Sequence, residues 1–99
     1  MNVSISKENG VLYIQPEGRL DTVNSAYLKE QIESAVPEGC DLELDFTNVD
    51  YISSAGLRLL VALQKMVNAS NNQMVIRNPN KVVKEIFTIA GFIKSFTIL

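Results

Sequence analysis

The stretch VDYISSAGLRLLVAL, residues 49–63, passes from a short strand-like run to a longer helix-like run at two adjacent serines. Before it, apolar and acidic residues alternate over residues 41–46, which is typical of a strand with one buried face. After the serines, Leu57, Leu60 and Leu63 recur at helical spacing and predict a helix from about residue 54 to residue 68. The serines therefore lie where a strand gives way to a helix, which is where α/β sheets usually place their sites.

The rest of the chain repeats this exchange of strands and helices. Period-two alternation predicts five strands, over residues 3–5, 12–14, 42–46, 74–76 and 96–98. Helical periodicity predicts two more helices, over residues 24–35 and about 79–90. Asn24 and Asn78 are the expected N-caps of these two helices. Gly91 is expected to end the last helix in the left-handed conformation, with Phe92 packing back on Phe87.

The alternation also predicts how the strands are arranged. Asn9 and Gly10 form a typical hairpin turn, so the first two strands should pair antiparallel, while each later strand follows a helix and should be parallel. Polar residues at every second strand position indicate that the helices cover mainly one face of the sheet. Right-handed crossovers on one face then add strands in one direction, so sheet order should follow chain order. We predict a single α/β domain over residues 1–99, with a mixed, mostly parallel five-stranded sheet.

Composition narrows the function. The 99 residues carry a net charge of −2 with scattered basic residues, which disfavours direct nucleic-acid binding, and no apolar run reaches the length of a membrane span. There is no histidine, so the commonest general base and metal ligand is missing, and we expect no enzyme activity, metal or cofactor. The single cysteine, Cys40, is expected in the core, and the absence of a disulfide framework and of a signal peptide indicates a cytoplasmic protein.

The two serines, Ser53 and Ser54, admit three roles. A serine at a helix start is a favoured N-cap that stabilises the helix by about 1 kcal/mol. A catalytic serine lacks a histidine base and the G-x-S-x-G pattern. A serine that accepts a phosphate fits the position, because the positive end of the helix dipole and the unpaired amides of the first turn favour negative charge. The residues leave the cap and the phosphate acceptor as open alternatives.

Three segments resemble the STAS domain family of bacterial anti-sigma factor antagonists. These are LDFTNVDYISSAGLRLL over residues 44–60, EGRLDTVNSAYLKEQI over residues 17–32, and VVKEIFTIAGFIKSFTI over residues 82–98. The resemblance implies a phosphorylation-controlled switch that binds an anti-sigma factor with serine kinase activity when unphosphorylated and is released when phosphorylated. A serine phosphatase would restore the unmodified form.

The resemblance also implies which residues form the site. Counting back from Gly56, the family's phosphate acceptor falls on Ser54, with Ser53 as the competing candidate. The implied partner-binding residues are Asp21, Asn24, Ser53, Ala55, Gly56 and Leu57. Asp45 matches a strand-end aspartate that could equally be structural, bonding loop amides.

The sequence departs from the family pattern in ways that keep a second function open. Ser53 stands where the family usually has an acidic residue, and Ala55 stands where it has a serine or threonine. The chain also has no helix after its last strand, so a homodimer or a closer partner contact would cover apolar surface left exposed. The alternative function is an accessory or scaffold subunit that is not phosphorylated, for example of a lipid-transport complex, in which the serine is only a cap.

Overall fold

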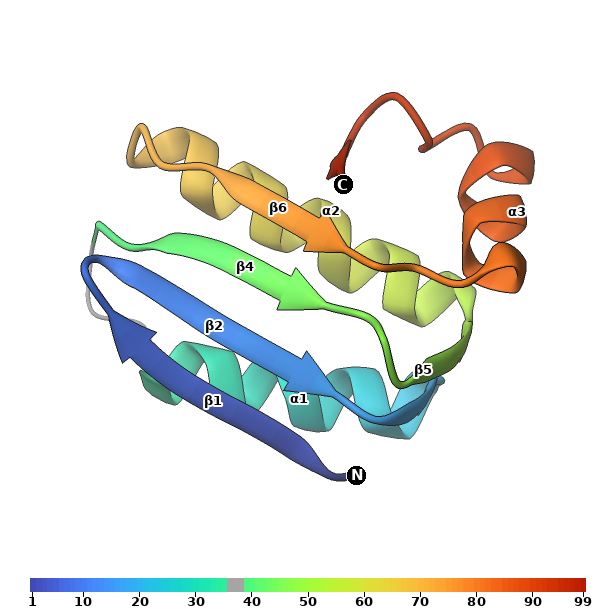
Figure 1. Cartoon of the computed structure of the whole chain (residues 1–99), viewed down its shortest axis with the longest axis horizontal. Helices are drawn as coiled ribbons and strands as arrows, with labels where there is room; N and C mark the ends of the chain where they lie inside the picture. The colour runs from blue at the N-terminus through green and yellow to red at the C-terminus, as the bar shows by residue number, and fades with distance from the viewer. Residues whose placement is uncertain (36–38) are drawn as a thin grey trace.

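The computed structural model describes residues 1–35 and 39–99 (Figure 1). In this part of the chain the elements follow the order β1 Val3–Glu8, β2 Val11–Pro16, β3 Gly18–Leu20, α1 Thr22–Ala35, β4 Asp41–Asp45, β5 Val49–Ile52, α2 Ser54–Ala69, β6 Met74–Arg77, α3 Lys81–Ile89 and β7 Thr97–Ile98. The predicted α/β class is confirmed.

The main sheet has the predicted order and directions. Its strands lie in the order β1-β2-β4-β6-β7, with β1 antiparallel to β2 and the remaining pairs parallel. Asn9 and Gly10 both have positive φ, at 52° and 77°, as a tight hairpin turn requires. Figure 1 shows α1 and α2 side by side on one face of this sheet, while α3 lies at the end where β6 stops. The prediction that sheet order follows chain order is therefore confirmed.

The core lies between the sheet and its helices. Strands β2, β4 and β6 bury every second residue, and the helices add an apolar stripe. The following side chains are at most 1% exposed: Leu12, Ile14, Leu42, Leu44, Met74, Ile76, Leu28, Ile32, Leu60, Val83 and Phe87. Cys40 is 5% exposed and packs within this core, as predicted. The other face of the sheet is polar, and the ion pair between Arg77 and Glu43 lies on it.

The sequence prediction missed a second, two-stranded sheet. β3 and β5 pair in parallel, with Leu20 opposite Ile52, and Arg19 stacks over the ring of Tyr51 at 4.6 Å. These strands have three and four residues, too few for period-two alternation to stand out. The consequence for function is direct, because β3 leads into α1 and β5 leads into α2, so this pairing fixes the starts of two helices beside each other.

Two predicted N-caps were wrong, by three residues at the first helix and by two residues at the last. The first helix begins at Thr22, where the Asp21 carboxylate accepts a hydrogen bond from the Asn24 backbone N–H at 2.9 Å, so Asn24 lies inside the first turn. The last helix begins after Asn80, whose side chain accepts from Val83 N–H at 2.8 Å. Asn78 instead has φ of 58°. In both places two cap-forming residues lie close together, and propensity alone does not choose between them.

Gly91 ends the last helix in the left-handed conformation, as predicted, whereas the ring contact of Phe92 is with Phe96 and not the expected one with Phe87. Gly91 has φ of 80°, and its N–H donates to Thr88 O while Phe92 N–H donates to Phe87 O at 2.8 Å. This is the double bond pattern of a Schellman motif. The Phe92 ring stacks on Phe96, which in turn meets Phe87 edge-on, so Phe96 joins the two rings.

Candidate functional site

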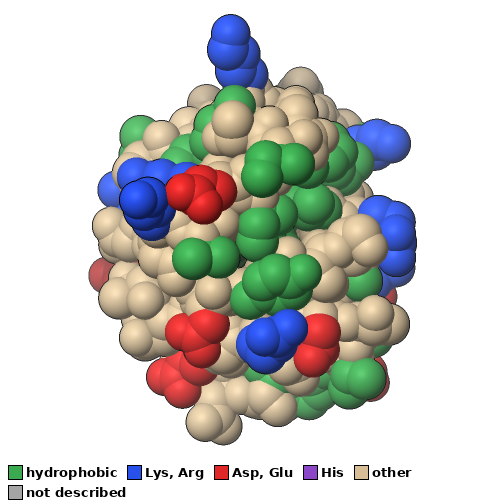
Figure 2. All heavy atoms as spheres, turned by 90° about the vertical axis from the view of Figure 1, so that its right-hand side faces the viewer, with side chains coloured by type: hydrophobic (Ala, Val, Ile, Leu, Met, Phe, Trp, Pro, Cys, Tyr) green, Lys and Arg blue, Asp and Glu red, His purple; other side chains and the backbone are tan. Residues whose placement is uncertain are grey.

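The starts of all three helices gather at one end of the molecule, on the right of Figure 1. Figure 2 looks straight at this end and shows hydrophobic side chains across its middle, with charged side chains around them. The first turns of α1 and α3 contribute Val23 and Val82, which are 75% and 49% exposed. An exposed apolar area rimmed by charge is typical of a protein-binding surface.

Ser53 is the N-cap of α2 and is fully engaged inside the fold. Its backbone is extended, with φ of −89° and ψ of 175°, and its hydroxyl accepts a hydrogen bond from Gly56 N–H at 3.3 Å. The same hydroxyl donates to Leu20 O at 2.8 Å, and the Ser53 backbone N–H donates to that carbonyl at 2.9 Å. The side chain of Ser53 therefore ties α2 to β3.

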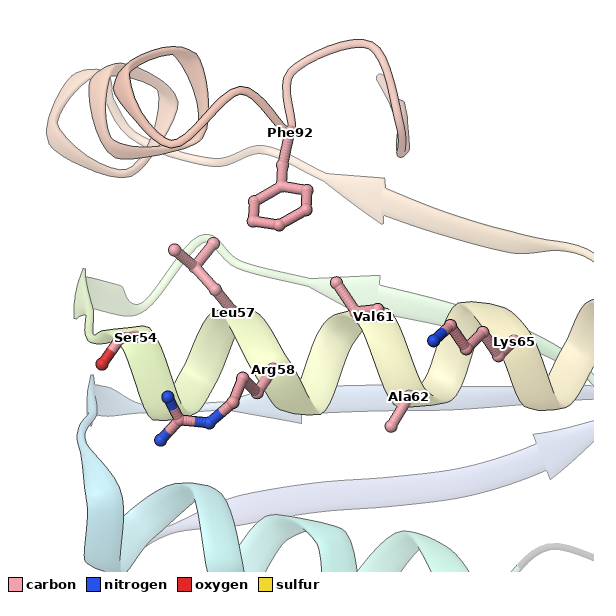
Figure 3. Close-up of a pocket in the computed structure, with 7 residues that line it drawn as sticks. All are labelled: Ser54, Leu57, Arg58, Val61, Ala62, Lys65 and Phe92. Atoms are coloured by element: carbon pink, nitrogen blue, oxygen red, sulfur yellow. The ribbon is translucent and has the colours of Figure 1, made fainter.

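Ser54 is placed quite differently. It is the first residue of α2, its side chain is exposed, and its hydroxyl forms no hydrogen bond with the residues that the structure describes. Figure 3 shows it at the open end of α2, one helical turn before Arg58. Of the two serines, Ser53 therefore caps the helix, while Ser54 presents a hydroxyl that has no partner among the described residues.

The remaining predicted partner-binding residues form one neighbourhood but are not equally accessible. Asp21 and Asn24 are half-buried beside the start of α1, and Ala55 is half-buried on α2. Helix α1 packs on α2 here, and residues of both line a common hollow, including Thr22, Ser25, Ala55 and Arg58. Gly56 is buried, and Leu57 is only 8% exposed, so these two support the surface more than they form it.

Gly56 is a glycine because two chain segments close in on it. A Cβ at this position would lie 2.6 Å from Ile52 Cγ1, 2.8 Å from Leu20 O and 3.1 Å from Leu20 Cβ. Non-bonded carbon atoms prefer separations of about 3.5–4.0 Å, so no larger side chain fits without moving the backbone of β3. The glycine lets the first turn of α2 rest directly on the β3–β5 pair.

Sequence reasoning missed Val23, Ser25 and Phe92 at this site. Val23 precedes Leu28 by five positions, which puts it outside the buried stripe of α1. An apolar residue outside that stripe could have indicated an exposed contact surface. Ser25 is 4% exposed, and its hydroxyl has no partner among the described residues. Phe92 lies beside α2 only through the turn after α3, which no local pattern predicts.

Asp45 has the structural role that the sequence left open. Its carboxylate accepts hydrogen bonds from the Thr47 hydroxyl, from Thr47 N–H and from the Asn78 side chain. The Thr47 hydroxyl bond is the main reason why the pKa of Asp45 lies below its ordinary value, and burial opposes it. Asp45 thereby holds the loop that leads from β4 to β5.

No group of three or more histidine, cysteine, aspartate or glutamate side chains lies close enough together to hold a metal ion in residues 1–35 and 39–99. Over the same residues, no helix is both long and apolar enough to span a bilayer.

The division of roles between the serines gives a stability prediction. Ser53→Ala removes the cap, so Gly56 N–H loses its acceptor and Leu20 O loses the hydroxyl as a donor. The free energy of unfolding should therefore fall by about 1–2 kcal/mol. Ser54→Ala removes an exposed hydroxyl and should change it by less than about 0.5 kcal/mol. Urea denaturation of both variants measures this, and an equal loss in the two would contradict the assignment of Ser53 as the cap.

Comparison with known proteins identifies related chains across this whole region. The STAS domain family matches residues 2–99. The anti-sigma-B factor antagonist of Listeria monocytogenes is 30% identical over 95 residues, which span 92% of this chain and 83% of the relative. The anti-sigma-B factor antagonist of Bacillus subtilis is 24% identical over 91 residues, with 92% and 84% covered. These names describe antagonists and no enzymatic reaction, in agreement with the sequence prediction.

Among solved structures, the fold is similar to that of the Bacillus cell fate determinant SpoIIAA. The phosphorylated form of that protein superposes with a TM-score of 0.75 at 16% identity, covering 99% of this chain and 91% of that one. A structure of the anti-sigma factor antagonist SpoIIAA in its unphosphorylated form gives a TM-score of 0.78 at 15% identity, with 99% and 87% covered. At these identities the likeness concerns the fold.

Proposed function

Because this chain belongs to the STAS domain family, we propose that it is an anti-sigma factor antagonist controlled by phosphorylation of Ser54. In this proposal the unmodified protein binds an anti-sigma factor that is also a serine kinase. Phosphorylation of Ser54 separates the two proteins, and a serine phosphatase restores binding. The observation that supports this most is the exposed, unbonded hydroxyl of Ser54 at the start of α2, next to a serine that is wholly engaged as a cap.

The geometry offers a physical reason why a phosphate would be tolerated by the fold. Ser54 occupies the first position of a 16-residue helix, where backbone N–H groups have no intrahelical partner and the helix dipole is positive. A phosphate adds about −1.5 to −2 charges and three acceptor oxygens at this point. Arg58, one turn further along, brings a positive charge to the same side of α2. Phosphorylation should therefore change the surface without unfolding the helix.

The same geometry supports release of the partner. Ser54 begins α2 at the end of the molecule seen in Figure 2, which the starts of α1 and α3 share. Those two helix starts carry the half-buried Asp21 and Asn24 and the exposed apolar Val23 and Val82. A partner seated on this end would bury the Ser54 side chain. A phosphate there would have to be desolvated on binding, which is costly unless it is paired. Loss of affinity after phosphorylation follows from that cost.

Phosphorylation by the cognate kinase tests the proposal. Incubated with that kinase and ATP, the wild-type chain should gain one phosphate by intact mass, and Ser54→Ala should gain none. Ser53→Ala is the matched control, because it removes the neighbouring hydroxyl and should still be modified while it remains folded. Phosphate on Ser53, or phosphate retained by Ser54→Ala, would refute the assignment. A chain that binds a transporter ATPase and takes up no phosphate would favour the accessory-subunit alternative.

A further inference from the structure

A second surface lies along the outer side of α2, away from α1. It is a groove of about 500 Å³ between α2 and the turn that follows α3. Its lining residues are Ser54, Leu57, Arg58, Val61, Ala62, Lys65 and Phe92. Figure 3 shows the side chains of Leu57 and Val61 directed toward the Phe92 ring, which forms the opposite wall. The groove has an apolar floor and runs parallel to the helix for about three turns.

Within residues 1–35 and 39–99, the charged residues that line this groove are basic. Arg58 and Lys65 line it, no acidic residue does, and neither cation forms an ion pair with the residues the structure describes. They are separated by seven positions, which is two turns of α2 or about 10 Å along its axis. A pair of unneutralised cations beside an apolar strip is complementary to an amphipathic partner that carries acidic residues.

We propose that this groove binds an acidic amphipathic helix of a partner protein. The partner helix would place apolar residues at i, i+3 or i+4 and i+7 along this strip, the usual mode of a helix in a groove. Val61 and Phe92, which are half-buried, would form most of the contact, with the more buried Leu57 beneath them. Acidic residues about seven positions apart would meet Arg58 and Lys65. The concave shape, bounded by Phe92 on one side and α2 on the other, suits a rod of about 10 Å diameter better than a flat bilayer.

The proposal does not depend on the phosphorylation switch, although Ser54 and Arg58 are among the residues that line the groove. The hollow between α1 and α2 lies on the other flank of α2, where Lys29 and Ala55 line it, and two residues, Arg58 and Ala62, line both. Binding of a helix in the groove requires neither kinase nor phosphate. Failure of Ser54 phosphorylation would therefore leave the groove test unaffected, and the two proposals can fail independently.

The test uses two fluorescent helical peptides of about 18 residues that share one leucine face. One carries glutamates seven positions apart beside that face, and the other carries lysines at the same positions. Fluorescence anisotropy with the whole chain should give a Kd roughly tenfold or more lower for the glutamate peptide. Amide chemical-shift changes should concentrate on residues 57–65 and on Phe92.

Charge reversal makes the test specific. Arg58→Glu combined with Lys65→Glu should weaken binding of the glutamate peptide roughly tenfold and should strengthen binding of the lysine peptide. Both residues are exposed, so the fold should persist, and each single variant should show a smaller change in the same direction. The matched control is Lys81→Glu with Lys84→Glu, which changes net charge equally on exposed positions of α3 outside the groove.

Four results would overturn the proposal. Equal affinity for the two peptides, or an equal loss in the α3 control, would show that groove charge does not select the ligand. Dimerisation in sedimentation runs that the Arg58→Glu, Lys65→Glu variant abolishes would assign the groove to a second copy of this chain. Binding to phosphatidylserine vesicles that the same variant abolishes, without binding of the glutamate peptide, would assign it to a membrane surface.

Discussion

Leu20→Ala is expected to lower the free energy of unfolding by about 2–5 kcal/mol and to disturb the candidate site as well. Leu20 is fully buried, so truncation loses apolar contacts and leaves a cavity. Its carbonyl also accepts hydrogen bonds from the hydroxyl and from the backbone N–H of Ser53, and its Cβ rests against Gly56. A shift of β3 into the cavity would therefore move the first turn of α2. Urea denaturation measures the first effect, and amide chemical shifts of residues 53–57 measure the second.

Leu63→Ala is the matched control for this prediction. Leu63 lies on α2, the helix that Ser54 begins, and is 3% exposed. Its truncation should lower the free energy of unfolding by a similar amount. It lies more than two turns beyond Ser54, so the amides of residues 53–57 should change little. If both variants disturb those amides equally, then Leu20 contributes only to the core and the bond from β3 does not position the site.

The parts of the fold that could be predicted are those set by local periodicity. Alternating residues such as Leu42 and Leu44 determine which face of a strand is buried, and a one-residue shift would expose the whole set. Short connections, right-handed crossovers and a single covered face then leave one strand order. The hairpin at Asn9 and Gly10 was predictable for the same local reason, because few residue pairs adopt two positive φ angles.

The features that escaped prediction depend on contacts between distant segments. The pairing of β3 with β5 joins residues about 31 positions apart, and each strand is too short to show a pattern. The distinction between Ser53 and Ser54 has the same origin. Both serines are good cap residues by type. The hydrogen bond from the Ser53 hydroxyl to Leu20 O, 33 positions away, favours Ser53 as the cap, and no local pattern reveals it. The wall that Phe92 gives the groove likewise depends on where the turn after α3 lies.

Gly56→Val is expected to destabilise the chain by about 3 kcal/mol, although valine is a better helix former than glycine. The propensity gain is a few tenths of a kcal/mol, whereas the first added carbon would already stand 2.8 Å from Leu20 O. That neighbour is backbone, so relief requires β3 and α2 to separate. Separation would strain the hydrogen bonds from Ser53 to Leu20 O, and the cap of α2 would weaken together with the packing.

Ala62→Val is the control, because it introduces the same residue into the same helix at an exposed position and should cost less than about 1 kcal/mol. Thermal unfolding should separate the two variants clearly, since each kcal/mol corresponds to about 4–8 °C in a domain of this size. If Gly56→Val proved no less stable than Ala62→Val, the close approach of α2 to β3 would not be rigid. The contact between α2 and β3 could then open, and Ser53 could lose its hydrogen bonds to Leu20 O. In that case Ser53 would expose its hydroxyl as Ser54 does, and both serines would have to be tested as the phosphate acceptor.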